Sequence, residues 1–166
     1  MHKLMRVQGA LLAEIDKYGK QVPDEERDEP IIWEQIHISS CAKIGWLLAE
    51  ERGVDPILAG VACACHDYGR IINGVQSGHA HFAYEPVKEF LAGLEIFTED
   101  EIEQIALAVR NHSDKAAVGS PLEEIVKDAD VLDFHQYGYE MPRKEQQDRL
   151  DKLLEGRAAA LRFSEA

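Results

Sequence analysis

The chain has 166 residues, of which 45% are hydrophobic and 30% are charged, and this composition is typical of one globular domain with its own core. Eighteen lysines and arginines oppose 31 aspartates and glutamates, and the net charge of −13 disfavours binding to the phosphate backbone of a nucleic-acid polymer. No apolar run approaches the roughly 20 residues that a membrane span needs, and three cysteines do not suit a disulfide framework, so we expect a single cytoplasmic domain over residues 1–166 without a membrane partner.

Helix signals follow one another along the chain, and no convincing strand alternation interrupts them. Apolar residues recur at helical spacing, and the gaps between the segments are short. The expected helices cover, in chain order, roughly residues 2–18, 31–52, 56–67, 83–92, 99–112, 121–134 and 145–163. The sequence therefore predicts an all-α fold, a compact bundle of about six or seven helices.

Local signals predict where several of these helices begin and end. Gly53 is expected to end the second helix, and Asp55 is a natural N-cap that starts the third. Capping boxes that begin at Thr98 and Ser120 open two later helices. Several glycines break the pattern over residues 69–82, so we expect an ordered loop there that carries polar groups.

Histidines and aspartates interrupt the apolar faces of these helices. His66 and Asp67 come together where the third helix is ending, so both side chains could reach one ion. His37 lies among apolar neighbours, His112 closes a helix, and Asp130 interrupts an otherwise apolar face. Each residue alone fits an ordinary role, such as a core histidine bonded to a carbonyl or an exposed carboxylate. One shared cause, a metal ion that needs inward-facing ligands, accounts for all of them together.

The order of these residues resembles the H…HD…D pattern of the HD-domain superfamily of metal-dependent phosphohydrolases. The pattern is carried, over roughly residues 31–134, by His37, His66, Asp67 and Asp130. His79 and His112, in Gly-His-Ala and Asn-His-Ser contexts, resemble the two extra histidines of the binuclear members. Residues 64–70 (ACHDYGR) and 109–113 (VRNHS) are similar to the symmetrical bis(nucleosyl) tetraphosphatase-like members of the superfamily.

The resemblance implies an HD-domain fold and a role for each of these residues. The first metal ion would be held by His37, His66, Asp67 and Asp130. Asp67 would also bridge to a second ion completed by His79 and His112, so we expect Asp67 to be catalytic. The implied reaction is hydrolysis of a phosphoester or phosphoanhydride of a nucleotide, or of another small phosphorylated metabolite, by a metal-activated water. Iron or manganese is favoured, and zinc, nickel and cobalt also suit such ligands.

Two assignments leave alternatives open at the sequence level. We prefer His79 to His81 as the ligand, although Pro86 is expected to delay the helix that relatives begin at this histidine; if neither binds, the site holds one ion. Arg70 and Arg110 are predicted to bind substrate phosphate, because a guanidinium can grip it bidentately. For both arginines a surface ion pair is the alternative.

The remaining polar residues carry weaker predictions. Cys41 follows His37 by one turn and could lie beside the metal, although packing is the preferred interpretation. Cys63 and Cys65 are expected to be small helix filler, because two positions apart they diverge around the helix. Asp133 and His135 are expected to line the mouth of the pocket or to be exposed polar residues.

Two further functions share the same residue pattern. The first is a di-iron oxygenase of the HD type. The second is a non-catalytic, metal-stabilised nucleotide-binding module, which is favoured if Arg70 and Arg110 point away from the pocket. The expected partner is a small phosphorylated substrate, and whether the chain forms a homodimer stays open.

Overall fold

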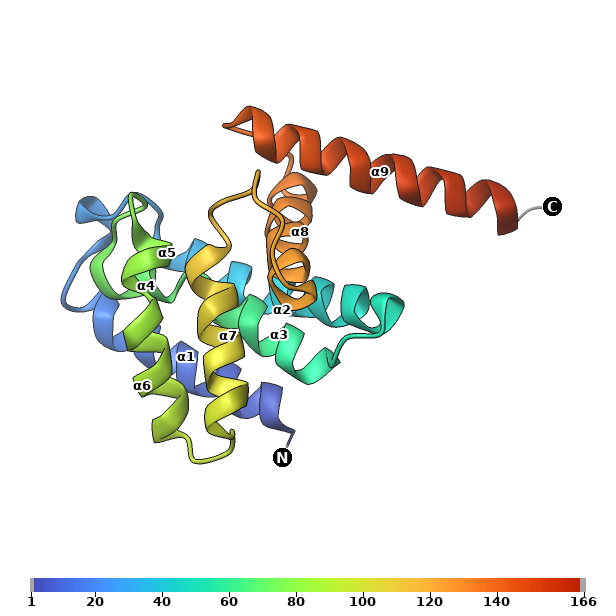
Figure 1. The fold of residues 1–166 in the computed structure, drawn as a ribbon. Coiled ribbons are helices and arrows are strands. Elements are labelled where there is room, and N and C mark those ends of the chain that lie inside the picture. The colour runs from blue at the N-terminus through green and yellow to red at the C-terminus, as the bar shows by residue number, and fades with distance from the viewer. Residues whose placement is uncertain (1, 165–166) are drawn as a thin grey trace.

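A computed structural model describes residues 2–164 and, for side chains, residues 2–156. Within these residues every regular element is helical, which confirms the all-α prediction (Figure 1). A single 3₁₀ turn covers Asp24–Glu26. The α-helices are α1 (Lys3–Gly19), α2 (Ile31–Arg52), α3 (Pro56–Cys65), α4 (Tyr68–Asn73), α5 (His79–Phe82), α6 (Tyr84–Gly93), α7 (Glu99–Asn111), α8 (Pro121–Gln136) and α9 (Lys144–Ser164).

The predicted loop over residues 69–82 is wrong, because this segment contains α4 and α5, and the described chain has nine α-helices as a result. Gly74 ends α4 in the left-handed conformation with a φ of 74°. Gly69 lies inside α4 and does not break it. A Cβ at Gly69 would collide with the backbone carbonyl of His79, so glycine is required here for the close approach of α4 and α5.

The predicted caps are confirmed by their hydrogen bonds. The Asp55 carboxylate accepts from the backbone N–H groups of Ile57 and Leu58, at 2.7 and 3.2 Å. Both capping boxes form, at the start of α7 and of α8. Pro86 lies in the first turn of α6, where its missing N–H has no partner to lose. The sequence predicted that Pro86 moves the start of this helix beyond His79. This prediction is wrong, because α5 begins at His79 itself.

The buried residues form one contiguous hydrophobic cluster with α3 at its centre. Helix α3 packs against α1, α2, α7 and α8, and every residue from Ala59 to Cys65 is buried. Its small side chains permit this crowding; a Cβ at Gly45 of α2 would overlap the sulfur of Cys63. Cys63 and Cys65 are buried free thiols and act as filler, as expected.

Helix α9 packs mainly against α8, also contacts the segment between α7 and α8 through Arg149, and then extends away from the other helices (Figure 1). Leu150 is buried in this contact, and Leu153 packs against the core from its edge. Across the part of the chain that the structure describes, no helix combines the length and hydropathy that crossing a bilayer requires.

Candidate metal centre

The six predicted metal ligands come from several helices and helix junctions and lie close together, and all of them except the fully buried His66 line one cavity. Their elements follow from local structure: three of the histidines stand at a helix end, where the chain turns and side chains of neighbouring helices can converge. His66 follows the last residue of α3, His79 is the first residue of α5, and His112 follows the last residue of α7. His37 lies within α2 and Asp130 within α8.

Asp67, between α3 and α4, lies at the middle of the cluster, and each of its two oxygens faces one pair of histidines. Oδ2 lies 3.4 Å from His37 Nε2 and 3.2 Å from His66 Nε2. Oδ1 lies 2.9 Å from His79 Nε2 and 3.6 Å from His112 Nε2. One carboxylate therefore joins two histidine pairs, which is the arrangement expected of a bridging ligand.

Asp130 completes the first group of ligands. Its Oδ1 lies 3.4 Å from His37 Nε2 and 3.6 Å from His66 Nε2. The second group consists of Asp67, His79 and His112, whose ligand atoms all lie within 4.8 Å of one another. The structure thus brings all six predicted ligands together, in two groups that share Asp67.

Hydrogen bonds on the outer side of each imidazole orient its ring. Three of the Nδ1 atoms face backbone carbonyl oxygens, which can only accept, so these nitrogens carry the proton and donate it. These bonds join His66 to Cys63 O (2.6 Å), His79 to Gln76 O (2.6 Å) and His112 to Val109 O (2.7 Å). In the neutral ring the lone pair is then on Nε2, the atom that faces Asp67.

The residues present fit a divalent metal ion. The Nε2 atoms of His37 and His66 are 3.0 Å apart, and those of His79 and His112 are 3.1 Å apart. Two lone pairs this close repel each other unless a proton or a cation lies between them. Because metal–imidazole bonds are about 2.1 Å long, two ligands of one ion lie about 3 Å apart, which agrees with these separations. Mixed imidazole and carboxylate donors suit first-row divalent metals.

Neighbouring cations keep the two carboxylates ionised. Burial alone would raise the pKa of Asp67, but the Arg70 guanidinium and then His66 hold it well below its usual range. Burial acts in the same direction on Asp130, and Lys115 and His37 likewise hold the pKa of that carboxyl well below its usual range. Both groups can therefore bind a cation without first losing a proton.

The imidazoles respond to burial in two ways. Burial lowers the pKa of His112 to about 3, so this ring is neutral and ready to bind a metal. Burial also acts to lower the pKa of His37, but hydrogen bonds to Asp130 and Asp133 outweigh it and raise the value well above normal. The pKa of His66 is raised by its carboxylate neighbours in the same manner. Without a metal, this pair holds a proton.

Arg70 lines the cavity, but its guanidinium already donates hydrogen bonds to protein groups and is not free to bind substrate phosphate as the sequence predicted. Its Nε donates to Glu34 Oε1 at 2.7 Å, its Nη1 donates to Gln76 Oε1 at 2.5 Å, and its Nη2 donates to Asp67 Oδ2. The Arg70 side chain is only 6% exposed, and Glu34 is fully buried beneath it. Arg70 therefore holds Asp67 in place and balances two buried carboxylates.

Arg110 is not brought to the cavity. It is exposed on α7, with its guanidinium carbon 5.5 Å from the centre of the Tyr84 ring, and it is not among the residues that line the site. His81 is exposed too, whereas His79 is 3% exposed and faces Asp67. The geometry therefore agrees with the choice of His79, and it contradicts the expected placement of Arg110.

Asp133 departs from both expected positions, whereas His135 is one of the exposed polar residues that the alternative predicts. Asp133 is fully buried, and its Oδ2 accepts the Nδ1 proton of His37 at 2.5 Å. It lies behind the ligand and not at the mouth of the cavity, because α8 turns its side chain inward toward α2. His135 is exposed and lies outside the cavity lining. Cys41 lies beside His37 as expected, and burial raises the pKa of its thiol, which favours packing over ligation.

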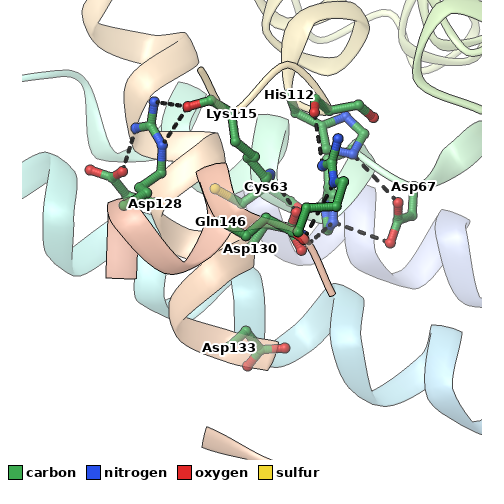
Figure 2. A network of polar contacts seen from close by, with 12 residues as sticks. Cys63, Asp67, His112, Lys115, Asp128, Asp130, Asp133 and Gln146 are labelled. Carbon is green, nitrogen blue, oxygen red and sulfur yellow. Dashed lines mark hydrogen bonds and ion pairs between the residues drawn. The ribbon is translucent and has the colours of Figure 1, made fainter. Parts of the chain in front are cut away.

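Lys115 is a site residue that the sequence pattern does not indicate. Its ammonium group lies 2.5 Å from Asp130 Oδ2, and its side chain is 1% exposed (Figure 2). Its backbone carbonyl accepts hydrogen bonds from Nε and Nη2 of Arg149 in α9, at 3.3 and 3.0 Å. Lys115 lies beyond the end of α7 and outside any helix, so helical spacing gives no signal that would have found it.

The cavity has a volume of about 190 Å³ and opens beside the first residues of α9. Trp33 forms part of its wall and stacks on His37, with 4.9 Å between the ring centres. Besides the metal-site residues, the lining includes Glu29, Trp33, Arg70, Gln76, Ser113, Lys115, Phe134, Pro142, Arg143 and Gln146. A larger depression beneath α9 shares Lys115 but has none of the six predicted ligands in its lining.

Comparisons with known proteins agree with this geometry. The fold is similar to the crystal structure of a predicted HD superfamily hydrolase from an uncultured Thermotogales bacterium. The TM-score is 0.57, with 20% sequence identity over 92% of this chain and 90% of that chain, a likeness that shows a shared fold. No curated protein matches the chain. A family model described as HD domain matches residues 35–135, which is more than half of the chain and includes all six predicted ligands. The chain therefore belongs to the HD-domain family.

Proposed function

We propose that the protein is a metal-dependent phosphohydrolase that cleaves a phosphoester or phosphoanhydride bond of a small phosphorylated compound. The observation that carries this proposal is the position of Asp67, whose two oxygens face separate histidine pairs. Membership of the HD-domain family supports it, since the residues of the family pattern are the ones that converge. A second ion is proposed because His79 and His112 face Asp67 from the side opposite to His37.

The proposed ligands form two sets that share one carboxylate. The first ion would be held by His37, His66, Asp67 and Asp130, and the second by Asp67, His79 and His112. Bound divalent ions of this kind lower the pKa of water and neutralise charge that develops on a phosphoryl group. We favour iron or manganese, and zinc, nickel or cobalt would also fit the donor set.

The residues around the ligands keep the site ready to bind. Arg70 keeps Asp67 ionised and Lys115 does the same for Asp130. Burial of the imidazoles keeps bulk water away from their nitrogens. The cavity lining holds as many carboxylates as cations: Glu29, Asp67 and Asp130 against Arg70, Lys115 and Arg143. Two divalent ions would make this region positive in a chain of net charge −13, which suits an anionic substrate.

The size of the cavity favours a compact reacting group. Sites that enclose a drug-sized ligand are usually about 300–1,000 Å³, and this cavity is about 190 Å³. We therefore propose that it takes the phosphate end of a nucleotide or of another phosphorylated metabolite, with the remainder outside. A nucleic-acid polymer is disfavoured by the overall negative charge.

The test is a screen of phosphorylated metabolites with protein whose metal content is measured in the same sample. We expect orthophosphate release that depends on the bound metal and is abolished in Asp67→Ala. Oxygen consumption without orthophosphate release would instead support a di-iron oxygenase. The third function, a non-catalytic binding module, is favoured if Arg70 and Arg110 both point away from the cavity; Arg110 does, but Arg70 lines it. Nucleotide binding without turnover in the metal-loaded protein would support this function and contradict the hydrolase.

A further inference from the structure

Three cations line the cavity, and they differ in how much of their charge is already balanced. Arg70 is 6% exposed and donates to the buried carboxylates of Glu34 and Asp67. Lys115 is 1% exposed and is paired with Asp130 at 2.5 Å. The side chain of Arg143 is 45% exposed and reaches none of these carboxylates within 4 Å. Arg143 is thus the cation of this lining that is best able to accept a new anion.

Two of the three polar contacts of Arg143 are longer than 3.2 Å, and its carboxylate partner is itself exposed. Nη2 donates to the backbone carbonyl of Ser113 at 3.0 Å, and Nε donates to Gln146 Oε1 at 3.4 Å. Nη1 lies 3.3 Å from a carboxylate oxygen of Glu145, whose side chain is 36% exposed. An exposed pair of this kind contributes little and is readily exchanged for another anion. Ser113 directly follows His112, and Arg143 lines the same cavity as His79 and His112.

The segment that carries Arg143 is fixed on both sides. On the α8 side, Tyr139 stacks on Phe134 with 4.8 Å between the ring centres and lies nearly perpendicular to the Trp33 ring. On the α9 side, Arg149 donates to Asp128 at 2.6 Å and to the carbonyl of Lys115. These contacts hold the start of α9 over the cavity.

Gln146, in the first turn of α9, links this helix to the metal site. It lines the same cavity as Asp130. Arg143 precedes Gln146 by three residues and lines the same cavity. The backbone that carries Arg143 is therefore already held beside the cavity, so this segment need not be ordered when an anion binds.

We propose that Arg143 binds the phosphate group of the substrate, the role that the sequence pattern predicts for Arg110. This inference rests on the proposed phosphohydrolase function and adds the residue that recognises the substrate. The planar guanidinium can donate two parallel hydrogen bonds to phosphate oxygens. On binding, the guanidinium would give up its contacts with Ser113 and Glu145 and form these two hydrogen bonds to phosphate, while Arg70 and Lys115 remain paired with their carboxylates.

The experiment compares the metal-loaded full chain with Arg143→Ala, Arg143→Lys and the control Arg110→Ala, which removes an exposed arginine outside the cavity. Binding of inorganic phosphate is measured by calorimetry, and KM and kcat are measured with a substrate found in the metabolite screen. Arg143→Ala is expected to weaken phosphate binding and to raise KM by about 10-fold to 100-fold, the loss of charge-assisted hydrogen bonds. Its kcat and metal content are expected to stay near the original values.

The lysine variant and the Arg110 control separate the geometry of the guanidinium from its charge and from its position. Arg143→Lys keeps the charge but offers one nitrogen, so an intermediate loss of phosphate affinity is expected; this variant also carries the test if the alanine variant does not fold. Arg110→Ala is expected to bind phosphate as the original protein does. Unchanged phosphate affinity and KM in both Arg143 variants would overturn the assignment and leave the hydrolase intact. An original protein that neither binds phosphate nor hydrolyses any phosphorylated compound when metal-loaded would overturn both proposals.

Discussion

His37 donates its Nδ1 proton to Asp133 Oδ2 across 2.5 Å, and this bond joins two buried side chains from α2 and α8. The other oxygen of Asp133 is buried and has no hydrogen-bond partner among the described residues, so the carboxylate acts on His37 alone. Trp33 stacks on the same imidazole from the cavity wall. Together the two contacts set the ring orientation and place the Nε2 lone pair toward Asp67 and Asp130.

Asp133→Asn is therefore expected to weaken metal binding by about 10-fold to 100-fold, because an amide no longer favours the Nδ1-protonated ring as a carboxylate does. Competition with a chelator of known affinity measures the change. Asp128→Asn is the matched control, since Asp128 is also a buried aspartate of α8 but pairs with Arg52 and Arg149. Equal metal affinity in Asp133→Asn and the original protein would show that the bond does not support the site.

Removal of individual ligands is expected to change the metal stoichiometry in two different ways. Asp67→Ala should lose both ions, because its two oxygens face both histidine pairs. His79→Ala or His112→Ala should lower the content toward one ion per chain. Elemental analysis of purified protein measures these contents, after helicity and thermal unfolding have shown that each variant is folded.

Cys65→Ala is the control for the stoichiometry series, since this buried thiol belongs to the packing of α3. Its metal content is expected to match that of the original protein. Two ions retained by Asp67→Ala would contradict the bridging role. An unchanged content after loss of His79 would show that the second set of ligands binds nothing.

Gly69→Ala is expected to disturb the second ion and to spare the first. The added methyl group would collide with the backbone carbonyl of His79, so the start of α5 has to move away from α4. His37 and His66 lie on other helices and need not shift. Gly93→Ala is the control, because a Cβ at that position meets no atom within 4 Å. The prediction is wrong if metal analysis finds the same content in both variants.

Metal binding is expected to release at least one proton per chain at neutral pH. The carboxylates around His37 and His66 raise the pKa of both imidazoles well above normal against the effect of burial, so the metal-free pair holds a proton between nitrogens 3.0 Å apart. A metal ion has to displace this proton, and metal affinity should therefore fall as the pH is lowered. Calorimetric titration in two buffers with different protonation enthalpies counts the protons released.

The raised pKa values of His37 and His66 also make the stability of the metal-free protein depend on pH. Because the folded-state pKa is raised, protonation stabilises the fold fully below the ordinary histidine value of about 6.5, and this contribution is lost as pH rises through the raised pKa. The metal-free protein should thus unfold at a lower denaturant concentration at high pH, and added metal should reverse the loss. If calorimetry finds that metal binds without proton release, then His37 and His66 do not share a proton in the metal-free protein.

Periodicity and caps were enough to predict most helices, because these signals act within one or two turns of chain. Asp55, Thr98 and Ser120 cap helices where the sequence indicates. The loop expected over residues 69–82 was wrong because a glycine that permits close packing has the same letter as one that breaks a helix. Gly69 is the first kind and Gly74 the second.

The helical class, and the identity of the six predicted ligands that lie together, could be inferred from the amino-acid pattern alone. Which other charged residues join them depends on the packing of the helices, which turns Asp133 inward, pairs Arg70 with Glu34 and Asp67, and leaves Arg110 outside. The reason is the distance along the chain over which each kind of interaction acts. A helix end depends on its neighbours in the chain, whereas the partner of a buried charge is chosen by contacts such as that between His37 and Asp133, which are 96 residues apart.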